Sequence, residues 1–256
     1  MAARRPSAYP PPVKVGEFIQ SPQAAEDERI DVGVLFVGAG PAGLAGAIRL
    51  GQLLADDPQT AERLGETPIA VLDKGRVAGA HLLSGAVVNP SALRDLLPGV
   101  DPATLPGCFG QVSKEAVYLM SKSYEVRIPT PPPFHNKGNL VFSLSQLGRH
   151  LAERAEELGV MVLPETDAQR LLVSGGAVRG VKTGDKGLDR EGEPLGSWEP
   201  GVEVQAQATV LSEGTQGHLA GAAIEHFSLA GDFPQVWSLG VKEVWRVAKP
   251  LDRVIH

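Results

Sequence analysis

The chain of 256 residues contains a single cysteine, Cys108. One thiol can form neither an internal disulfide nor a metal or cluster site made of cysteines alone. No activating neighbour is visible beside it, so we interpret Cys108 as a packing residue. The six histidines show no H-E-x-x-H or comparable ligand spacing, and we predict no metal site.

Basic runs and aromatic residues are also scarce. The formal net charge is −6 and aromatic residues make up 5% of the chain. Proteins that bind nucleic acid usually present a basic surface, and no Lys/Arg-rich segment is visible here. The composition therefore argues against a nucleic-acid partner. A G-x-S-x-G elbow and a P-loop are absent as well.

Long hydrophobic runs are limited to one stretch. Residues 32–48 carry no charge, but glycines and Pro41 interrupt them, and a membrane span needs about 20 apolar residues. The first 29 residues lack the apolar core of a secretory signal, and their acidic residues are wrong for a transit peptide. We predict a flexible, proline-rich leader over residues 1–29.

Beyond the leader, the sequence predicts an α/β fold with a doubly wound sheet. Val32–Val37 is a short apolar run that suits a buried parallel strand, and Ala42–Leu54 has apolar residues at helical spacing. Asp56–Thr67 is interpreted as a polar loop and Ile69–Leu72 as a second buried strand. The β-α-β order is typical of such sheets.

The pattern then becomes irregular and β-rich before it returns to alternating elements. We predict an amphipathic helix at Pro90–Pro98 and an antiparallel hairpin within Val112–Ile128. Later elements, in chain order, are a strand at Val141–Leu144, a helix at Ser145–Leu158 with Ser145 as N-cap, a strand at Val160–Leu163, a hairpin turning at Gly175–Gly176, a polar insertion at Asp185–Pro200, a strand from Gly201 and a helix at Gly217–His226.

The stretch G-x-G-x-x-G at Gly38, Gly40 and Gly43 follows a predicted strand and opens a predicted helix. In a nucleotide fold the first glycine makes the tight turn, the second lets the backbone approach a pyrophosphate, and the third packs helix against strand. The helix N-terminus supplies free N–H groups and a positive dipole. Asp73 ends the second strand, where an acid accepts a hydrogen bond from a ribose hydroxyl. These features together predict a nucleotide site.

The order of elements favours FAD over NAD. A simple NAD domain would continue in regular β-α alternation, whereas here a glycine loop and a β-rich excursion intervene. A second glycine element, Val210–Leu219, then returns at a strand end. A flavin electron carrier needs no catalytic acid, base or nucleophile from the protein, because the redox chemistry belongs to the cofactor, so we assign no catalytic residue.

Five segments together resemble one family, the electron-transfer flavoprotein–ubiquinone oxidoreductases. They run in order from about Asp31 to His256 and read "VLFVGAGPAGLAGAIRL", "VLDKGRVAGAHLLSGAVVNPSAL", "GNLVFSLSQLGRHLAERAEELGVMVLPE", "VLSEGTQGHLA" and "SLGVKEVWRV". The resemblance implies a glutathione-reductase-like FAD-binding Rossmann domain, interrupted by a β-rich excursion. It also implies peripheral placement on a membrane and electron transfer from reduced electron-transfer flavoprotein to ubiquinone.

The resemblance also implies a set of cofactor-binding residues. These are the pyrophosphate turn Gly38, Ala39, Gly40, Pro41, Ala42 and Gly43; the acid Asp73; the loop near the flavin with Gly79, Ala80, His81, Ser84 and Gly85; and the later element with Glu213, Gly214 and Gly217. The segment from His81 to about Val100 corresponds to part of the family's membrane-contacting surface. Its leucines, Leu93, Leu96 and Leu97, suit either insertion into a membrane interface or a protein core.

The expected domain organisation follows from these assignments. After the leader we expect a first FAD-binding segment with the membrane-surface loop at 30–110, a β-rich excursion at 111–140, a continued FAD-binding segment at 141–226, and the start of a second β-rich, quinone or substrate, domain at 227–256. Members of the family are roughly twice this long and carry a 4Fe-4S cluster on four cysteines, which this chain cannot ligate. We therefore expect a fragment, a truncated reading frame, or a separately encoded partner half.

Three functional hypotheses remain open. The first is the FAD-dependent part of an electron-transferring-flavoprotein dehydrogenase on the cytoplasmic membrane of a bacterium, or on the matrix side of the mitochondrial inner membrane. The second is a related reductase or hydroxylase that uses FAD and NAD(P)H, similar to geranylgeranyl reductases or aromatic hydroxylases. The third is a non-catalytic, truncated FAD-binding remnant.

Overall fold

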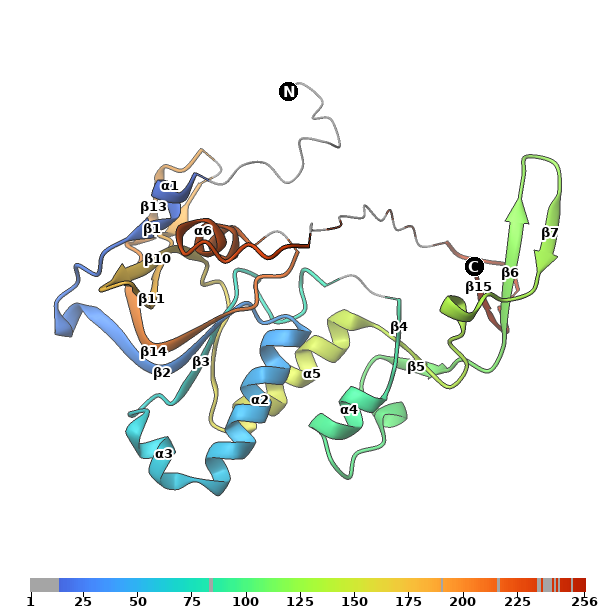
Figure 1. Cartoon of the computed structure of the whole chain (residues 1–256), viewed down its shortest axis with the longest axis horizontal. Helices are drawn as coiled ribbons and strands as arrows, with labels where there is room; N and C mark the ends of the chain where they lie inside the picture. The colour runs from blue at the N-terminus through green and yellow to red at the C-terminus, as the bar shows by residue number, and fades with distance from the viewer. Residues whose placement is uncertain are drawn as a thin grey trace. The chain divides into compact units, whose positions relative to one another are not determined.

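The computed structural model describes residues 14–82, 85–189, 191–215, 217–233, 236, 241, 243, 245–249 and 251–256. The chain forms two compact units (Figure 1). Unit 1 contains the described residues of 1–82 and 148–230, and unit 2 contains those of 83–147 and 231–256.

Unit 1 is built on a seven-stranded sheet. Across the sheet the order is β1 (Ile19–Gln20), β10 (Ala168–Ser174), β11 (Ala177–Thr183), β14 (Glu203–Leu211), β2 (Arg29–Val37), β3 (Ile69–Leu72) and β9 (Met161–Leu163). Strands β14, β2, β3 and β9 are parallel to one another, and β11 and β10 continue the sheet beyond β14 in antiparallel pairing. This arrangement confirms the predicted α/β class.

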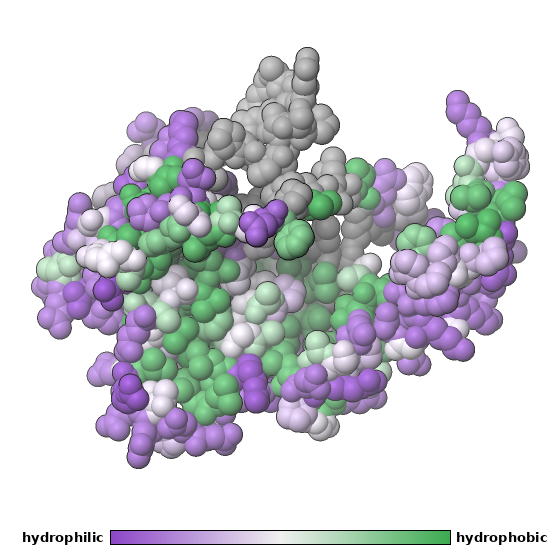
Figure 2. Space-filling view, in the orientation of Figure 1, coloured by the Kyte–Doolittle hydropathy of each residue, from purple (hydrophilic) through white to green (hydrophobic). Residues whose placement is uncertain are grey.

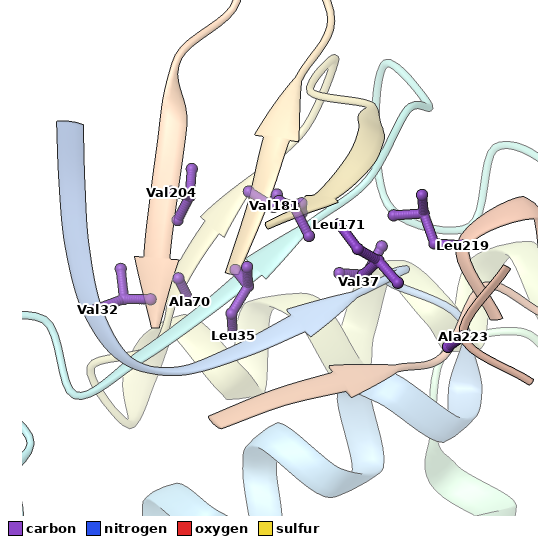
Figure 3. Close-up of a cluster of buried hydrophobic side chains, with 10 residues drawn as sticks. Val32, Leu35, Val37, Ala70, Leu171, Val181, Val204, Leu219 and Ala223 are labelled. Carbon is purple, nitrogen blue, oxygen red and sulfur yellow. The ribbon is translucent and has the colours of Figure 1, made fainter. Parts of the chain in front are cut away.

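Helices cover both faces of this sheet. In Figure 1, α2 (Pro41–Asp56) and α5 (Leu144–Glu157) lie on one side and α6 (His218–His226) on the other. The predicted apolar face of α2 is buried, with Leu44 and Ile48 fully inaccessible. On the other side a cluster of buried side chains joins the strands to Leu219 of α6 (Figure 3). Burial of apolar residues on both faces explains why β3 is apolar at every position.

The predicted hairpin at Gly175–Gly176 is confirmed. Ser174 pairs with Ala177, which leaves a two-residue turn. Both glycines have positive φ, +61° and +74°. Two consecutive residues of that kind define a type I′ turn, whose twist matches the strands that it joins.

Two local predictions were wrong. The predicted polar loop after α2 contains a short helix, α3 (Pro58–Arg63), because the Asp57 side chain accepts hydrogen bonds from both the backbone N–H and the hydroxyl of Thr60. Helix α5 begins at Leu144, one residue before the predicted N-cap Ser145, and the Oγ of Ser143 accepts from the N–H of Gln146 at 3.4 Å. The polar insertion predicted at 185–200 is a separate case: it is largely exposed and forms an antiparallel pair of β12 (Lys186–Leu188) and β13 (Pro194–Glu199).

The predicted flexible leader is corrected in its second half. Residues 1–13 lie outside the described residues. From residue 14 the chain forms α1 (Val15–Phe18), β1 and a 3-10 turn, η2 (Glu26–Glu28). Phe18 and Ile19 pack against the core cluster, and Ile19 pairs with Leu171 in parallel register. These apolar contacts hold the segment on unit 1 despite its polar surroundings.

Unit 2 contains two small sheets, and its limits differ from the predicted 30–110 and 111–140 segments. One sheet has the order β4 (Ala86–Val88), β8 (Leu140–Phe142), β5 (Cys108–Gln111), and the other β15 (Val254–Ile255), β6 (Glu115–Met120), β7 (Glu125–Ile128). Because β8 pairs with both β4 and β5, residues from 86 onward belong with the excursion. The remaining elements are α4 (Ser91–Leu96), η3 (Pro102–Thr104) and η4 (Pro132–Phe134).

The predicted hairpin within 112–128 is confirmed as the antiparallel pair β6–β7. Ala116 and Val117, near the start of β6, are buried. Leu119, Met120 and Val126, nearer the turn of the hairpin, are exposed. Figure 2 shows hydrophobic surface over the elements that Figure 1 labels β6 and β7.

Glu115, at the start of β6, organises the neighbouring loop. Its carboxylate accepts hydrogen bonds from the N–H groups of Asn136 at 2.8 Å and Lys137 at 3.2 Å, and His256 Nε2 lies 3.6 Å away. Burial alone would raise the pKa of Glu115, but these hydrogen bonds outweigh it and hold the pKa below its ordinary value.

Candidate nucleotide-binding site

The glycine turn begins where β2 ends. Gly38 has a φ of +109°, a conformation that favours glycine. Its N–H donates to the carbonyl oxygen of Leu72 at 2.8 Å. A Cβ at this position would lie 2.5 Å from the carbonyl oxygen of Ser212. Gly38 therefore allows the chain segments after β2 and β14 to approach each other at the carboxyl end of the sheet.

Gly40 and Gly43 have opposite surroundings. A Cβ at Gly43 would lie 2.1 Å from the carbonyl oxygen of Gly38 and 2.5 Å from Ser212 Oγ, so this glycine is needed for packing. A Cβ at Gly40 would meet nothing within 4 Å, and its φ of −77° is one that any residue adopts. The space beside Gly40 is open at the first turn of α2, where the second glycine of the fingerprint admits a pyrophosphate.

The first turn of α2 presents unpaired backbone donors. The first N–H groups of any helix have no carbonyl of the same helix to bond. Pro41 at the first helical position has no N–H, which leaves Ala42 and Gly43 as the next donors along the turn. With the helix dipole, these groups favour an anion.

Asp73, the predicted acid, follows β3 directly and lies beside the glycine turn. Its Oδ2 accepts a hydrogen bond from the N–H of Ala39 at 2.8 Å, and its Oδ1 accepts from the N–H of Gly75 at 2.7 Å. The carboxylate thus ties the turn to the segment after β3. Each oxygen keeps acceptor capacity for a further donor such as a ribose hydroxyl.

Ser212 is a site residue that the sequence alone did not single out. Its Oγ lies 2.9 Å from the carbonyl oxygens of both Val37 and Gly38, which share its one proton, and its N–H donates to Val37. This hydroxyl fixes the second glycine element against the first. In the sequence, the feature that points to a role for Ser212 in the site is its position directly before Glu213, at the end of a predicted strand.

Glu213 acts within the protein by capping α6. Its two carboxylate oxygens accept from the N–H groups of Leu219 at 3.2 Å and Ala220 at 2.7 Å. A Cβ at Gly217 would lie 2.8 Å from Glu213 Cβ and Oε2, so Gly217 makes room for the cap. Gly214 between them has a φ of +79°. The three predicted residues of this element therefore form one capped turn.

The predicted loop near the flavin is divided. In unit 1, Gly79 has a φ of +82°, and the Cα of Gly79 lies against Gly148 of α5, where a Cβ would come within 3.2 Å. Ala80 and His81 are exposed. Ser84 lies outside the described residues. Gly85, with a φ of +77°, belongs to unit 2, where its N–H donates to Phe142.

Two leucines are buried in the segment that resembles a membrane-contacting surface. Leu93 is 7% exposed and Leu97 4% exposed, so both face the core of unit 2. Within the described part of the chain, no helix is long and apolar enough to cross a bilayer. The same residues contain no group of His, Cys, Asp or Glu side chains that could hold a metal ion.

These features define the class of fold. A parallel sheet with a glycine turn after its first central strand, an acid after the next and a second glycine element beyond β14 is a Rossmann-like fold of the FAD-binding type. The flavin-dependent monooxygenase PieE, solved with FAD and substrate, has this fold: it aligns with a TM-score of 0.50 at 17% identity over 74% of this chain and 31% of that chain.

Curated electron transfer flavoprotein-ubiquinone oxidoreductases match most of the chain, which confirms the resemblance found in the sequence. The probable one from Acinetobacter baylyi is 37% identical over 227 residues, 87% of this chain and 39% of the relative. The Pseudomonas aeruginosa protein is 39% identical over 87% of this chain and 40% of the relative. The probable mitochondrial one from Schizosaccharomyces pombe is 41% identical over 87% and 34%. The chain thus spans between 34% and 40% of these relatives' length. No family model matches it.

Proposed function

We propose that the glycine turn of unit 1 binds the ADP end of FAD. The open side of Gly40, the free N–H groups of α2 and the carboxylate of Asp73 lie at one end of the sheet, and this arrangement carries the proposal. The donors of Ala42 and Gly43 suit a pyrophosphate, and Asp73 suits a ribose hydroxyl. When bound, FAD supplies the redox chemistry, and the protein's part is to hold and orient it.

The rest of the predicted site belongs to the same proposal. Gly38 and Gly43 fix the turn, Ser212 and Glu213 fix the second glycine element against it, and Gly79, Ala80 and His81 are the unit 1 residues that we expect near the flavin. Ala39, Pro41, Gly214 and Gly217 contribute backbone shape. Asp73 has a double role in this account, because it also positions Ala39 through a hydrogen bond.

For the activity, we propose the FAD-binding part of an electron transfer flavoprotein-ubiquinone oxidoreductase. The support is 37–41% identity to proteins of that name over 87% of the chain. Reduced electron-transfer flavoprotein and ubiquinone are then the proposed partners of the complete protein, with peripheral attachment to a bacterial cytoplasmic membrane or to the mitochondrial inner membrane. A 4Fe-4S cluster would need ligands from outside this sequence, which has one cysteine.

The test is FAD titration of the purified chain, followed by quenching of flavin fluorescence. The wild-type chain should bind one FAD, and Gly40→Ala should bind about tenfold more weakly or worse, because a methyl group fills the space of the pyrophosphate. Gly196→Ala is the matched control: its Cβ also meets nothing within 4 Å, but it lies in the exposed strand β13, away from the glycine turn in the sequence. Equal affinity in all three proteins would refute the proposed site.

Reduction of the flavin bound to the purified chain distinguishes the three functional hypotheses. Bleaching of the bound flavin by NAD(P)H without any partner would support the reductase or hydroxylase. Bound flavin that reduced electron-transfer flavoprotein reduces would support the leading proposal. Bound flavin that neither NAD(P)H nor reduced electron-transfer flavoprotein reduces would support the non-catalytic, FAD-binding remnant.

A further inference from the structure

A segment of the leader, which we call the N-terminal strap (residues 14–23), is attached to unit 1 at three points. The ring of Phe18 stacks on that of His218, with centroids 5.6 Å apart and planes 8° from parallel. Ile19 and Gln20 pair with β10. The N–H of Gln23 donates to both carboxylate oxygens of Glu203, at 3.0 and 3.2 Å.

The strap supplies hydrogen bonds to a buried carboxylate, that of Glu203. Glu203 is only 2% exposed, and a buried carboxylate needs hydrogen-bond donors to offset its lost hydration. The side-chain amide of Gln20 also points to it, at 3.4 Å, and the same amide's oxygen accepts from Arg170. Glu203 therefore makes the strap part of the fold of unit 1.

The stacking partner of Phe18 opens the helix that the second glycine element caps. His218 is the first residue of α6, directly followed by the N–H groups that Glu213 binds. Next to Glu213, Ser212 donates to the carbonyls at the end of β2, and its Oγ would touch any Cβ at Gly43. A continuous set of contacts thus joins the strap, α6 and the glycine turn.

We propose that the N-terminal strap is a positioning element for the nucleotide site, with Phe18 as its main residue. By holding the start of α6, the stack keeps Glu213 and Ser212 in place, and these keep the glycine turn in the shape that binds pyrophosphate. This inference rests on the proposed FAD site. Because binding energies are reciprocal, a strap that strengthens FAD binding is itself held more firmly when FAD is bound.

Two substitutions test the role of the ring. Phe18→Leu keeps an apolar side chain against the core cluster but removes the stack, and should weaken FAD binding about fivefold or more, the usual lower range for coupled sites. Phe18→Tyr keeps the ring and should bind FAD like the wild type. Val160→Ala is the control that lowers stability without touching the strap. Val160 is buried in unit 1, just before β9, and its N–H donates to the carbonyl oxygen of Ala155 in α5, not to the strap or the glycine turn.

Amide hydrogen exchange supplies the second readout. In the FAD-free chain, Phe18→Leu should speed exchange at Leu219 and Ala220, whose N–H groups bind Glu213, and Val160→Ala should not. In the wild type, bound FAD should slow amide exchange in the strap. The factor of slowing should equal the factor by which loss of the strap weakens FAD binding.

The outcomes separate this inference from the FAD proposal. A wild-type chain that binds no FAD overturns the proposed function, and with it the basis of the inference. If the wild type binds FAD and Phe18→Leu binds it equally well, the FAD site stands and the positioning role is refuted. If Val160→Ala weakens binding as much as Phe18→Leu, the strap contributes only general stability and the inference also fails.

Discussion

Gly40 and Gly43 lie three residues apart in one turn, and the structure predicts opposite results when each becomes alanine. At Gly43 the new Cβ would lie 2.1 Å from a backbone carbonyl oxygen, which cannot move without shifting the end of β2. Overpacking of this kind costs about 2 kcal/mol or more, which corresponds to about 4–8 °C in Tm for a unit of this size.

At Gly40 the two contributions to stability nearly cancel. Alanine is a poorer helix N-cap than glycine by about 0.5–1 kcal/mol. Replacing glycine at a φ of −77° also restricts the unfolded chain, which stabilises the fold by about 0.4–1 kcal/mol. The net change in unfolding free energy is expected to be within about 0.5 kcal/mol.

Chemical denaturation without ligand, followed by FAD titration, measures both properties on the same proteins. We expect Gly43→Ala to lose stability, and Gly40→Ala to keep its stability and lose FAD affinity. The reasoning is refuted if Gly43→Ala is as stable as the wild type, or if Gly40→Ala loses stability and affinity together.

Substitutions at four further positions test contacts of the second glycine element and of unit 2. Ser212→Ala removes the hydroxyl that binds the carbonyls at the end of β2 and should cost about 1 kcal/mol of unfolding free energy, whereas Ser212→Thr should restore most of it. Glu213→Ala uncaps α6 and should cost about 1–2 kcal/mol in a denaturant titration; an unchanged midpoint would contradict the cap. The pKa of Glu115 is lowered in the fold, so its contribution to stability is present above its ordinary value of 4.5 and is lost as the pH falls through the folded value. Glu115→Gln should flatten the acid limb of the unfolding curve, and an identical pH profile would show that the N–H groups of residues 136–137 do not favour the charged form. Leu93→Ala empties a buried position and should cost about 2–5 kcal/mol without changing sedimentation with lipid vesicles, whereas a loss of vesicle binding at unchanged stability would place this leucine at a membrane.

Local sequence patterns were sufficient for the centre of unit 1. The runs at Val32–Val37 and Ile69–Leu72 are apolar because both faces of the strands are covered, and that property is visible without a structure. Asp73 could be placed at the strand end by the same reasoning. Its hydrogen bond to Ala39 could not, because it depends on how the glycine turn folds back over β3.

Long-range contacts explain what the patterns missed. The leader has a polar, proline-rich composition, and its order comes from Leu171, Glu203 and His218, which are about 150 to 200 residues away along the chain. The limits of unit 2 follow in the same way from β8, which pairs with both β4 and β5. Helix α3 is a different case: Asp57 and Pro58 are an N-cap and first-turn signal that the polar composition concealed.

Titration of the isotope-labelled chain with ADP, followed by amide NMR shifts, tests the central claim most directly, because ADP is the part of FAD that the glycine turn is proposed to hold. We expect the amides of Gly40, Ala42 and Gly43 to show the largest shifts, together with the segment after Asp73, and FAD to shift the same signals. Shifts confined to other parts of the chain, or no saturable shift with either ligand, would contradict the account.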